Sequence, residues 1–464
     1  MLTRKQILTD HKKMKKVLPL LLAAVLLAGC GEAGGNAGTA QTGSGADSVS
    51  GTTQTSSSEG SGSGIAQSGS GSGNQFTAAG DSSEAVSAVS GRTEGSGDSE
   101  DAYIVTEGIS DAPAVGDLTC SGKLRLDYAE RFNVYYYDGG YKLFAVSDTE
   151  GNTTDYLLIP EGKEAPAGLS DDIITVQAPL DHIYMAASGS MCFFPALGCL
   201  DDVTTTAIDR DGWKIQEPID ALDDGRMKYA GKYSEPDYEL LLNDGCDAAI
   251  ESTMILHSPE TQEMLQDLGI PVIIDRCSYE QDPFGRMEWV KFYGALMGKE
   301  QEADDYFSQE IDSLGDYKSY QDTGKTAAFF SVNSAGQIMA RRSDDFIPNL
   351  MKMAGGTYVF SDLKNPAGDS AIVNMTMEEF YNESKDADYL IYNATIEAPL
   401  TGIKDLESKS SLFSDFKAVQ NGNVWQVDNT WYQATDHVGE LLTDFHLMFT
   451  GGDAEQMTFL TKLS

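Results

Sequence analysis

The stretch FGRMEWVKFYGALMGKEQEADDYFSQEIDSL, residues 284–314, decides the architecture. Its apolar residues recur at steps of three and four, from Trp289 and Tyr293 to Phe307, while charged residues such as Lys291 lie off this stripe. Because no proline interrupts it, the pattern predicts one long surface helix of about 46 Å. A helix of that length is suited to join two halves of a protein.

Similar patterns lie on both sides of this helix. Short apolar strands are expected at 182–186, 203–208, 247–250 and 271–274 before it, and at 326–332, 357–360, 389–392 and 423–427 after it. Helices are expected at 191–200, 237–242, 259–268, 377–381 and 435–450. Helices that alternate with such strands indicate a mainly parallel sheet covered on both faces. The fold class is therefore α/β, with lobe one at 178–283, an inter-lobe helix at 284–318 and lobe two at 319–464.

A different pattern precedes lobe one, in residues 101–177. Aromatic segments alternate with polar positions between residues 124 and 160 (FNVYYYD, YKLFAVS, DYLLIP), and turns of the types DGG and EGN separate them. This pattern predicts a small antiparallel β meander appended to lobe one. Its tyrosines pack within the sheet or, alternatively, bind carbohydrate.

Residues 1–30 have the composition of an export signal. Basic residues come first, an apolar run from Val17 to Leu27 follows, and the segment ends in Leu27-Ala28-Gly29-Cys30. The run is too short for a stable membrane span. The ending resembles a bacterial lipobox, which implies lipidation of Cys30, although an ordinary signal peptide with a chance cysteine remains the alternative.

Residues 31–100 consist mostly of Gly, Ser, Thr and Ala. A chain of this composition does not bury enough apolar surface to offset its ordering entropy, so a disordered linker is expected. Its expected end-to-end distance is about 45 Å, which lifts a folded domain clear of a membrane.

Composition excludes several function classes. The net charge of -40 argues against nucleic acid as a partner, because no excess of basic residues is available to bind phosphates. The motifs His-Glu-x-x-His, Cys-x-x-Cys and Gly-x-Ser-x-Gly are absent, so neither an enzyme nor a metal site is predicted and no catalytic residue is assigned. The five cysteines beyond Cys30 are expected to be buried thiols.

Four phrases resemble a known family. They are PDYE running into GCDAAI (236–250), LGIPV (268–272), ADYLI (387–391) and FKAVQNGNV (416–424). In this order about the long helix, they resemble the substrate-binding lipoproteins of ABC importers for iron complexes, haem and cobalamin. The family's opening strand usually carries an arginine and a Thr-Glu pair, where this chain has HIYMAASGS (182–190).

The resemblance implies a location and partners. It implies a monomer on the outer face of the cell membrane, anchored only by lipid (palmitate) on Cys30. The partners would be the permease and ATPase subunits of an importer, and no resident cofactor is expected.

Ligands of open α/β sheets lie beyond the carboxyl ends of the strands. Applied to both lobes, this rule selects the candidate ligand-binding residues Tyr184, Ser188, Ser190, Met191, Glu251, Ser252, Thr253, Met254, Tyr279, Asn333, Arg341, Arg342, Asn393, Trp431 and Tyr432.

The neighbouring arginines Arg341 and Arg342 indicate an anionic ligand, because guanidinium groups bind carboxylate or catecholate oxygens in bidentate fashion. Alternatively, they pair with the nearby acids Asp344 and Asp345. Tyr184, Trp431 and Tyr432 would stack on a flat ligand, or pack in the core. Met254 and His257 are close enough in sequence to ligate haem iron, although a lone histidine beside a helix start is more often structural.

The family docks on its permease through one glutamate from each lobe. Glu378, in Thr376-Met377-Glu378, matches the pattern in lobe two, and its counterpart in lobe one is expected between residues 217 and 224. An acid at a helix start also favours the helix dipole, which is the alternative explanation for Glu378.

The sequence therefore predicts a lipid-anchored receptor that captures a ferric siderophore between two lobes for iron transport. A receptor for haem or cobalamin is the first alternative. A surface adhesin that uses the meander is the second.

Overall fold

The computed structural model describes residues 103–365, 370–395 and 398–464. Contacts divide the chain into two units, Met1–Asp98 and Ser99–Ser464, and every described residue belongs to the second unit. The predictions for the export signal, Cys30 and the linker at 31–100 lie outside the described residues.

A six-stranded sheet, here called the N-terminal sheet, begins the described chain. Its strands lie side by side in sequence order and are antiparallel up to the fifth, whereas the sixth is parallel to the fifth. The sheet is therefore larger than the predicted meander. The strands are β1 (Ile104–Val105), β2 (Cys120–Leu124), β3 (Phe132–Tyr137), β4 (Tyr141–Ser147), β5 (Thr153–Ile159) and β6 (Ile174–Gln177).

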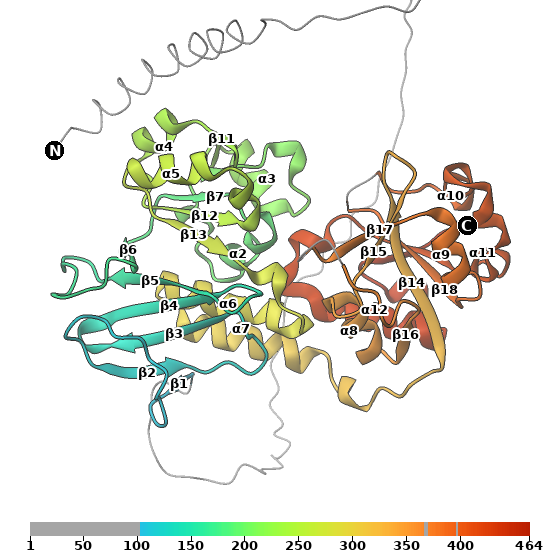
Figure 1. Cartoon of the computed structure of the whole chain (residues 1–464), viewed down its shortest axis with the longest axis horizontal. Helices are drawn as coiled ribbons and strands as arrows, with labels where there is room; N and C mark the ends of the chain where they lie inside the picture. Colours follow the sequence, from blue (N-terminus) through green and yellow to red (C-terminus); the bar gives the residue numbers. More distant parts are fainter. Residues whose placement is uncertain (1–102, 366–369, 396–397) are drawn as a thin grey trace, which may run out of the picture. The chain divides into compact units, whose positions relative to one another are not determined.

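The two faces of the N-terminal sheet pack differently. Tyr135 and Tyr137 are buried in a small core of their own, so these tyrosines contribute to packing. On the opposite face Phe132 and Phe144 contact Phe292, with ring centroids 5.4 and 5.0 Å apart. These aromatic contacts bury the sheet against the stretch 284–314 (Figure 1).

A parallel sheet of five strands follows, in the order β13-β12-β7-β8-β9. With its helices it forms the first lobe. Its strands are β7 (Ile183–Met185), β8 (Thr205–Thr206), β9 (Lys228–Tyr229), β12 (Ala248–Ser252) and β13 (Val272–Asp275). Its helices are α2 (Phe193–Ala196), α3 (Gln216–Asp223), α4 (Tyr238–Asp244) and α5 (Pro259–Asp267), with a small hairpin of β10 (Gly231–Lys232) and β11 (Glu235–Pro236).

The stretch 284–314 forms two helices, so the prediction of a single long helix is wrong. Helix α6 (Pro283–Met297) ends at Gly298, whose φ of 67° is left-handed, and α7 (Glu300–Ser313) begins two residues later. The helices then pack closely, because a Cβ at Gly294 would collide with the side chain of Ala303. The 14 residues of α7 span only about 21 Å.

Helix α6 is also not a surface helix. Its charged residues Glu288 and Lys291 are 0% and 3% exposed, and they form an ion pair of 3.2 Å with each other. A second ion pair of 3.1 Å joins Lys291 to Asp304 of α7. The apolar stripe in the sequence correctly identified the inner face of α6. The polar face of α6 is buried too, because α7 and the N-terminal sheet cover it.

The second lobe has a seven-stranded sheet in the order β17-β15-β14-β18-β19-β20, and β16 pairs with the first half of β14. Its strands are β14 (Lys325–Val332), β15 (Ile338–Arg341), β16 (Gly356–Tyr358), β17 (Ile372–Met375), β18 (Tyr389–Asn393), β19 (Val424–Val427) and β20 (Leu460–Lys462). Its helices are α8 (Phe346–Met353), α9 (Met377–Ser384), α10 (Ile403–Lys409), α11 (Lys417–Gln420) and α12 (Val438–Thr450). Strands β15, β17 and β20 are antiparallel to their neighbours and were not predicted.

The two lobes are joined by several contacts. Gln433 is fully buried; its Oε1 accepts the N–H of Lys214 at 2.6 Å, and its Nε2 donates to the carbonyl of Gly212 at 3.1 Å. The hydroxyl of Thr435 donates to the carbonyl of Gly189 at 2.6 Å. The segment 431–437 of the second lobe is therefore hydrogen-bonded into the first, beside the junction that α6 and α7 make.

Two buried glutamates fix the N-terminal sheet to α6. The carboxylate of Glu288 accepts the backbone N–H groups of Asp127, Tyr128 and Ala129 at 2.8–2.9 Å. Glu280 in the same way accepts those of the next two residues. A buried carboxylate is tolerated only with such partners, so the loop 127–131 is held in one conformation.

Replacing Glu288 tests this arrangement. We expect Glu288→Ala to lower the free energy of unfolding by about 3–5 kcal/mol, because three backbone N–H groups lose their acceptor and the buried Lys291 loses an ion-pair partner. The control is Glu302→Ala, an exposed acid of α7, for which the change stays within about 0.5 kcal/mol. Urea denaturation followed by circular dichroism measures both, and equal stability of the two variants would contradict the assignment.

Candidate functional site

A cavity of about 750 Å³ lies between the two lobes. Segments of both lobes, of α6 and of the N-terminal sheet line it. Ten of the residues predicted to bind ligand are in its lining: Ser188, Ser190, Ser252, Thr253, Met254, Tyr279, Arg341, Arg342, Trp431 and Tyr432.

The wall from the first lobe follows the strand-end rule. The segments after β7, β12 and β13 form short 3-10 helices, Ser188–Ser190, Thr253–His257 and Cys277–Tyr279, and all three line the cavity. Parallel strands end at the same edge of a sheet, so their following segments converge there. The hydroxyl of Ser190 donates to the buried carboxylate of Asp275 at 2.7 Å, which fixes two of these segments to each other.

Five predicted residues lie outside the cavity lining. Tyr184 in β7 and Glu251 in β12 are fully buried, because alternate side chains of a strand point to opposite faces of the sheet. Met191, which follows the 3-10 helix Ser188–Ser190, is fully buried in the core. Asn333 closes the turn between β14 and β15 through its Oδ1, which accepts the N–H groups of residues 335 and 337. Asn393 is buried, and its Oδ1 accepts the hydroxyl of Thr395 at 2.8 Å. The turn at Asn333 joins β14 to the unpredicted antiparallel strand β15, and Asn333 is not part of the cavity lining.

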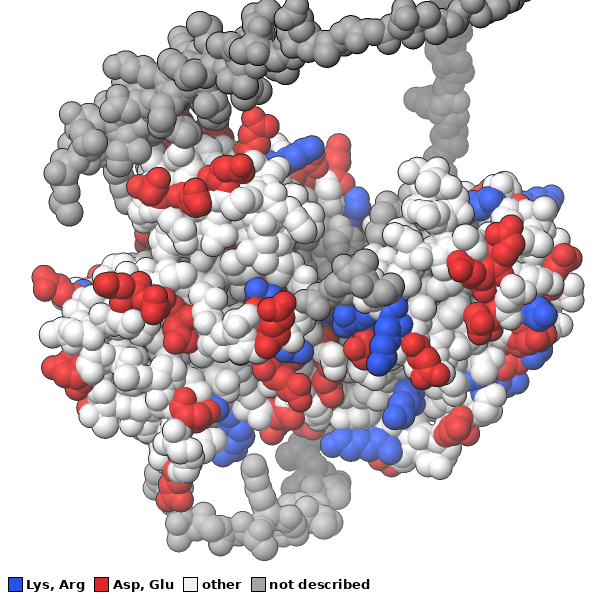
Figure 2. Space-filling view, viewed as in Figure 1, with Lys and Arg blue, Asp and Glu red and all other residues white. Residues whose placement is uncertain are grey.

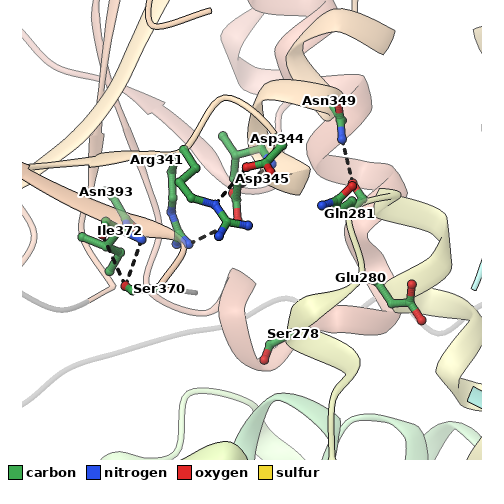
Figure 3. A network of polar contacts seen from close by, with 12 residues as sticks. Ser278, Glu280, Gln281, Arg341, Asp344, Asp345, Asn349, Ser370, Ile372 and Asn393 are labelled. Carbon is green, nitrogen blue, oxygen red and sulfur yellow. Dashed lines mark hydrogen bonds and ion pairs between the residues drawn. The ribbon is translucent and has the colours of Figure 1, made fainter. Parts of the chain in front are cut away.

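The predicted arginine pair lines the cavity and also contacts the nearby acids. Nη1 of Arg341 lies 3.8 Å from Oδ2 of Asp345, and Nε of Arg342 lies 2.9 Å from Oδ1 of Asp344. Both arginine side chains are less than a fifth exposed. Figure 3 shows Arg341 beside these acids, close to the segment at Ser370 and Ile372. The Arg341 guanidinium keeps further N–H donors, because an arginine has five and its contact with one carboxylate uses at most two.

A third arginine of the cavity, Arg286, was not predicted. It projects from the first turns of α6, and its guanidinium lies 3.5 Å from the ring centre of Phe346 in α8. Its Nε donates to the carbonyl of Glu280 at 3.2 Å, and burial lowers its pKa. Arg286 therefore joins the two lobes across the cavity. The sequence did contain a signal for this residue, an arginine within the apolar stretch 284–314. On a predicted surface helix, however, an arginine is expected and does not indicate a site.

A second contact between the lobes lies next to Arg286. The side-chain amide of Asn349 in α8 donates to the carbonyl of Gln281 at 2.9 Å. Figure 3 shows Asn349 directed at Gln281 from the neighbouring helix.

The aromatic wall of the cavity comes from the second lobe. Trp431 is 8% exposed and packs on Phe346, with ring centroids 5.7 Å apart. Its Nε1 is buried without an acceptor among the described residues. The hydroxyl of Tyr432 accepts a hydrogen bond of 2.9 Å from Nε2 of Gln433, and burial raises its pKa. Both rings thus combine core packing with a surface on the cavity.

The mouth of the cavity on the first-lobe side is apolar. Met254 and Leu256 are 47% and 48% exposed, which is unusual for large apolar side chains, and both line the cavity with His257. The structure therefore brings Met254 and His257 to the site, as the haem alternative requires.

A group of possible metal ligands lies elsewhere in the first lobe. Ligand atoms of Asp181, His182 and Asp247 lie within 4.8 Å of one another. The carboxylate of Asp247 accepts the backbone N–H groups of Asp181 and His182 at 3.1 and 3.0 Å, so it holds the start of β7. This hydrogen bonding explains the cluster without a metal ion.

The cysteines in the described part of the chain can be compared with the prediction of buried thiols. Cys192, Cys199, Cys246 and Cys277 are buried free thiols, as predicted, and Cys120 is partly buried. Burial raises the pKa of the Cys246 thiol to about 12, which makes it a poor nucleophile at neutral pH.

Several known proteins are similar to this chain in sequence or in fold. No family model matches the chain. An uncharacterized lipoprotein of Methanocaldococcus jannaschii is 24% identical over 354 residues, which cover 70% of this chain and 80% of that protein. A putative ABC transporter substrate-binding lipoprotein of Bacillus subtilis is 28% identical over 136 residues, which cover 28% of this chain and 42% of that protein.

A solved structure shows the fold. A periplasmic binding protein from Veillonella parvula superimposes with a TM-score of 0.50 at 16% identity, and the match covers 66% of this chain and 99% of that one. The fold is thus that of a periplasmic binding protein. The resemblance predicted from the sequence, to substrate-binding lipoproteins of ABC importers, is confirmed.

A search of the described residues for helices that are long and apolar enough to cross a membrane gave none.

Glu251 provides a pH test of the first lobe. Burial raises its pKa to about 8 from an ordinary value of 4.5, and neither carboxylate oxygen has a partner among the described residues. Between these values the folded state binds more protons than the unfolded state, so the free energy of unfolding falls as the pH rises. We expect Glu251→Gln to flatten this dependence between pH 5 and about 8.

The measurement is urea denaturation at several pH values. The control is Glu260→Gln, an exposed acid of α5, which should keep the wild-type dependence. Parallel curves for wild type and Glu251→Gln would show that Glu251 is ionised in the folded protein at neutral pH.

Proposed function

We propose that the protein is an extracytoplasmic receptor of an ABC importer and that it captures an anionic iron chelate between its lobes. The observation that carries the proposal is a group of arginines in one cavity of an acidic chain. Arg286, Arg341 and Arg342 line the cavity together with Asp275, Asp344 and Asp345, whereas the whole chain has a net charge of -40. Figure 2 shows acidic side chains over much of the face in view, with several basic ones grouped near its middle.

Physical chemistry supports an anionic ligand. An acidic surface repels anions at long range, so the arginines have to be concentrated in the cavity to bind one. In a partly buried site, guanidinium groups form charge-assisted hydrogen bonds with carboxylate or catecholate oxygens, and these bonds are about twice as strong as neutral ones. Ferric siderophores carry such donor groups and therefore suit the arginines of the cavity. The cavity volume of about 750 Å³ is within the usual range for small-molecule sites.

Haem or cobalamin is the second candidate ligand. Met254 and His257 supply possible axial ligands, and Trp431 supplies a flat aromatic surface on the opposite wall. For either ligand, the receptor performs no bond chemistry. The adhesin alternative has no specific observation in its favour, because Tyr135 and Tyr137 are buried in the N-terminal sheet.

The receptor would act at the outer face of the cell membrane. Lipidation of Cys30 with palmitate would anchor it, and a monomer would deliver its ligand to the permease and ATPase subunits. The similarity to lipoproteins of Methanocaldococcus jannaschii and Bacillus subtilis supports this location.

The internal repeat of the two lobes suggests the docking acids. Asp388 follows α9 and accepts the N–H of Thr326 at the start of β14, and Asp247 follows α4 and accepts that of His182 before β7. Helices α9 and α4 are therefore equivalent. Their first turns carry the exposed acids Glu378 and Glu239.

This equivalence changes the expected docking residue of the first lobe. We propose Glu239 in place of an acid between residues 217 and 224. In α9 the neighbouring Glu379 is engaged in the capping box with Thr376, whereas Glu378 does not take part in it.

Ligand binding is the first test. Wild-type protein is screened by thermal shift against ferric catecholates, ferric hydroxamates, haem and cyanocobalamin. A ligand at a hundred times its dissociation constant adds about 2.7 kcal/mol of stability. We expect Arg341→Gln and Arg342→Gln each to weaken an anionic chelate about tenfold or more, because each removes a charge-assisted hydrogen bond.

The matched control is Arg210→Gln, an exposed arginine paired with Asp223 in the first lobe. It should bind like wild type. A wild-type protein that binds none of the chelates, or arginine variants with wild-type affinity, would count against the proposed ligand.

Docking is tested by charge reversal. We expect Glu239→Lys and Glu378→Lys each to weaken binding to the reconstituted permease at least about tenfold, because like charges would then oppose each other at the contact. Affinity for the ligand should not change, since both residues lie outside the cavity lining. Glu260→Lys on α5 is the control, and a loss of similar size in that variant would assign the effect to net charge alone.

A further inference from the structure

The N-terminal sheet contributes directly to the cavity between the lobes. Arg131, which precedes β3, and Thr149, in the turn between β4 and β5, are both in the cavity lining. They come from the segment that the sequence predicted as an appendage of the first lobe. The cavity therefore has three walls, from the first lobe, the second lobe and the N-terminal sheet.

Both segments are held rigidly at the cavity. The N–H of Arg131 donates to the buried carboxylate of Glu280 at 2.8 Å, and its Nη1 donates to the carbonyl of Asp148 at 3.0 Å. The carboxylate of Asp148 in turn accepts the N–H groups of Glu150 and Asn152 at 2.9 and 2.8 Å. These hydrogen bonds connect the turn that carries Thr149 to Arg131, so a ligand meets a preorganised surface.

The side chain of Arg131 has a donor left over. Its Nε is buried and has no acceptor among the described residues, although a buried N–H group without an acceptor is costly. The nearby Glu280 already accepts the N–H groups of Glu130 and Arg131 and the indole N–H of Trp289. A ligand oxygen does not reach this buried Nε, but the same guanidinium carries Nη2, which takes part in none of these hydrogen bonds and can donate to an anionic oxygen in the cavity.

We propose that the N-terminal sheet is the third wall of the ligand site and that Arg131 binds an anionic oxygen of the ligand. This proposal rests on the proposed function and narrows its ligand class. Arg341 and Arg342 bind from the second lobe, and Arg131 binds from the N-terminal sheet. The ligand then carries anionic groups on separate sides, as a ferric complex of several catecholates or carboxylates does, whereas an uncharged hydroxamate complex does not.

Thr149 lines the cavity on the same side as this arginine. In this proposal the N-terminal sheet contributes to ligand specificity as well as covering the first lobe.

The test compares two chelates on four proteins of the full chain. The chelates are an anionic ferric tris-catecholate and an uncharged ferric tris-hydroxamate, and binding is followed by quenching of tryptophan fluorescence, since Trp431 lines the cavity. The proteins are wild type, Arg131→Gln, Arg131→Lys and the control Arg226→Gln, an exposed arginine paired with Asp201. Thermal unfolding checks that each variant is folded.

We expect Arg131→Gln to weaken the tris-catecholate about tenfold to a hundredfold, because a charge-assisted hydrogen bond is lost. Arg131→Lys keeps the charge but lacks the planar donor group, so its affinity for the tris-catecholate should lie between those of wild type and Arg131→Gln. Any affinity for the tris-hydroxamate should be unchanged, and Arg226→Gln should bind like wild type.

Two outcomes overturn different conclusions. If wild type binds neither these chelates nor the haem and cobalamin of the wider screen, the proposed function fails. If wild type binds the tris-catecholate and Arg131→Gln binds it equally well, the third wall is overturned while the receptor function stands. Should Arg131→Gln not fold, Arg131→Lys decides in the same way: wild-type affinity overturns the proposal and a loss of affinity for the tris-catecholate supports it.

Discussion

The arrangement depends on two buried carboxylates at the junction of three parts of the molecule. Glu280 and Glu288 accept five consecutive backbone N–H groups of residues 127–131. An ionised carboxylate in the interior is costly without such partners, so the loop stabilises the two buried glutamates. The glutamates in turn hold the loop in one conformation. The N-terminal sheet, α6 and the first-lobe wall of the cavity are consequently one structural unit.

The second lobe meets this unit through contacts made around the cavity itself. Arg286 stacks on Phe346, and Gln433 and Thr435 donate to carbonyls of the first lobe. Because the residues that join the lobes neighbour the residues that line the cavity, a change in the separation of the lobes changes the shape of the site. The same geometry brings the arginines of the cavity together, since Arg286 comes from α6 and Arg341 from the second lobe.

Local sequence patterns predicted much of the fold. The strand at 326–332 and the helices at 259–268 and 377–381 match β14, α5 and α9 within a few residues, because their hydrophobic periodicity and capping residues are local signals. The failures have physical causes as well. Gly298 ends α6 in a left-handed conformation that an apolar period does not reveal, and the strands β15, β17 and β20 are short and depend on neighbours far along the chain.

By itself, the sequence determined the α/β class with many of its strands and helices, the resemblance to substrate-binding lipoproteins, and the choice of Arg341 and Arg342, which line the cavity. Only the tertiary structure decided that Tyr184 and Glu251 face the core and that Arg131 and Arg286 face the cavity. The reason is the range of the interactions. Periodicity and caps act within a few residues, whereas the hydrogen bonds from residues 127–131 to Glu280 and Glu288 bring together segments about 150 residues apart.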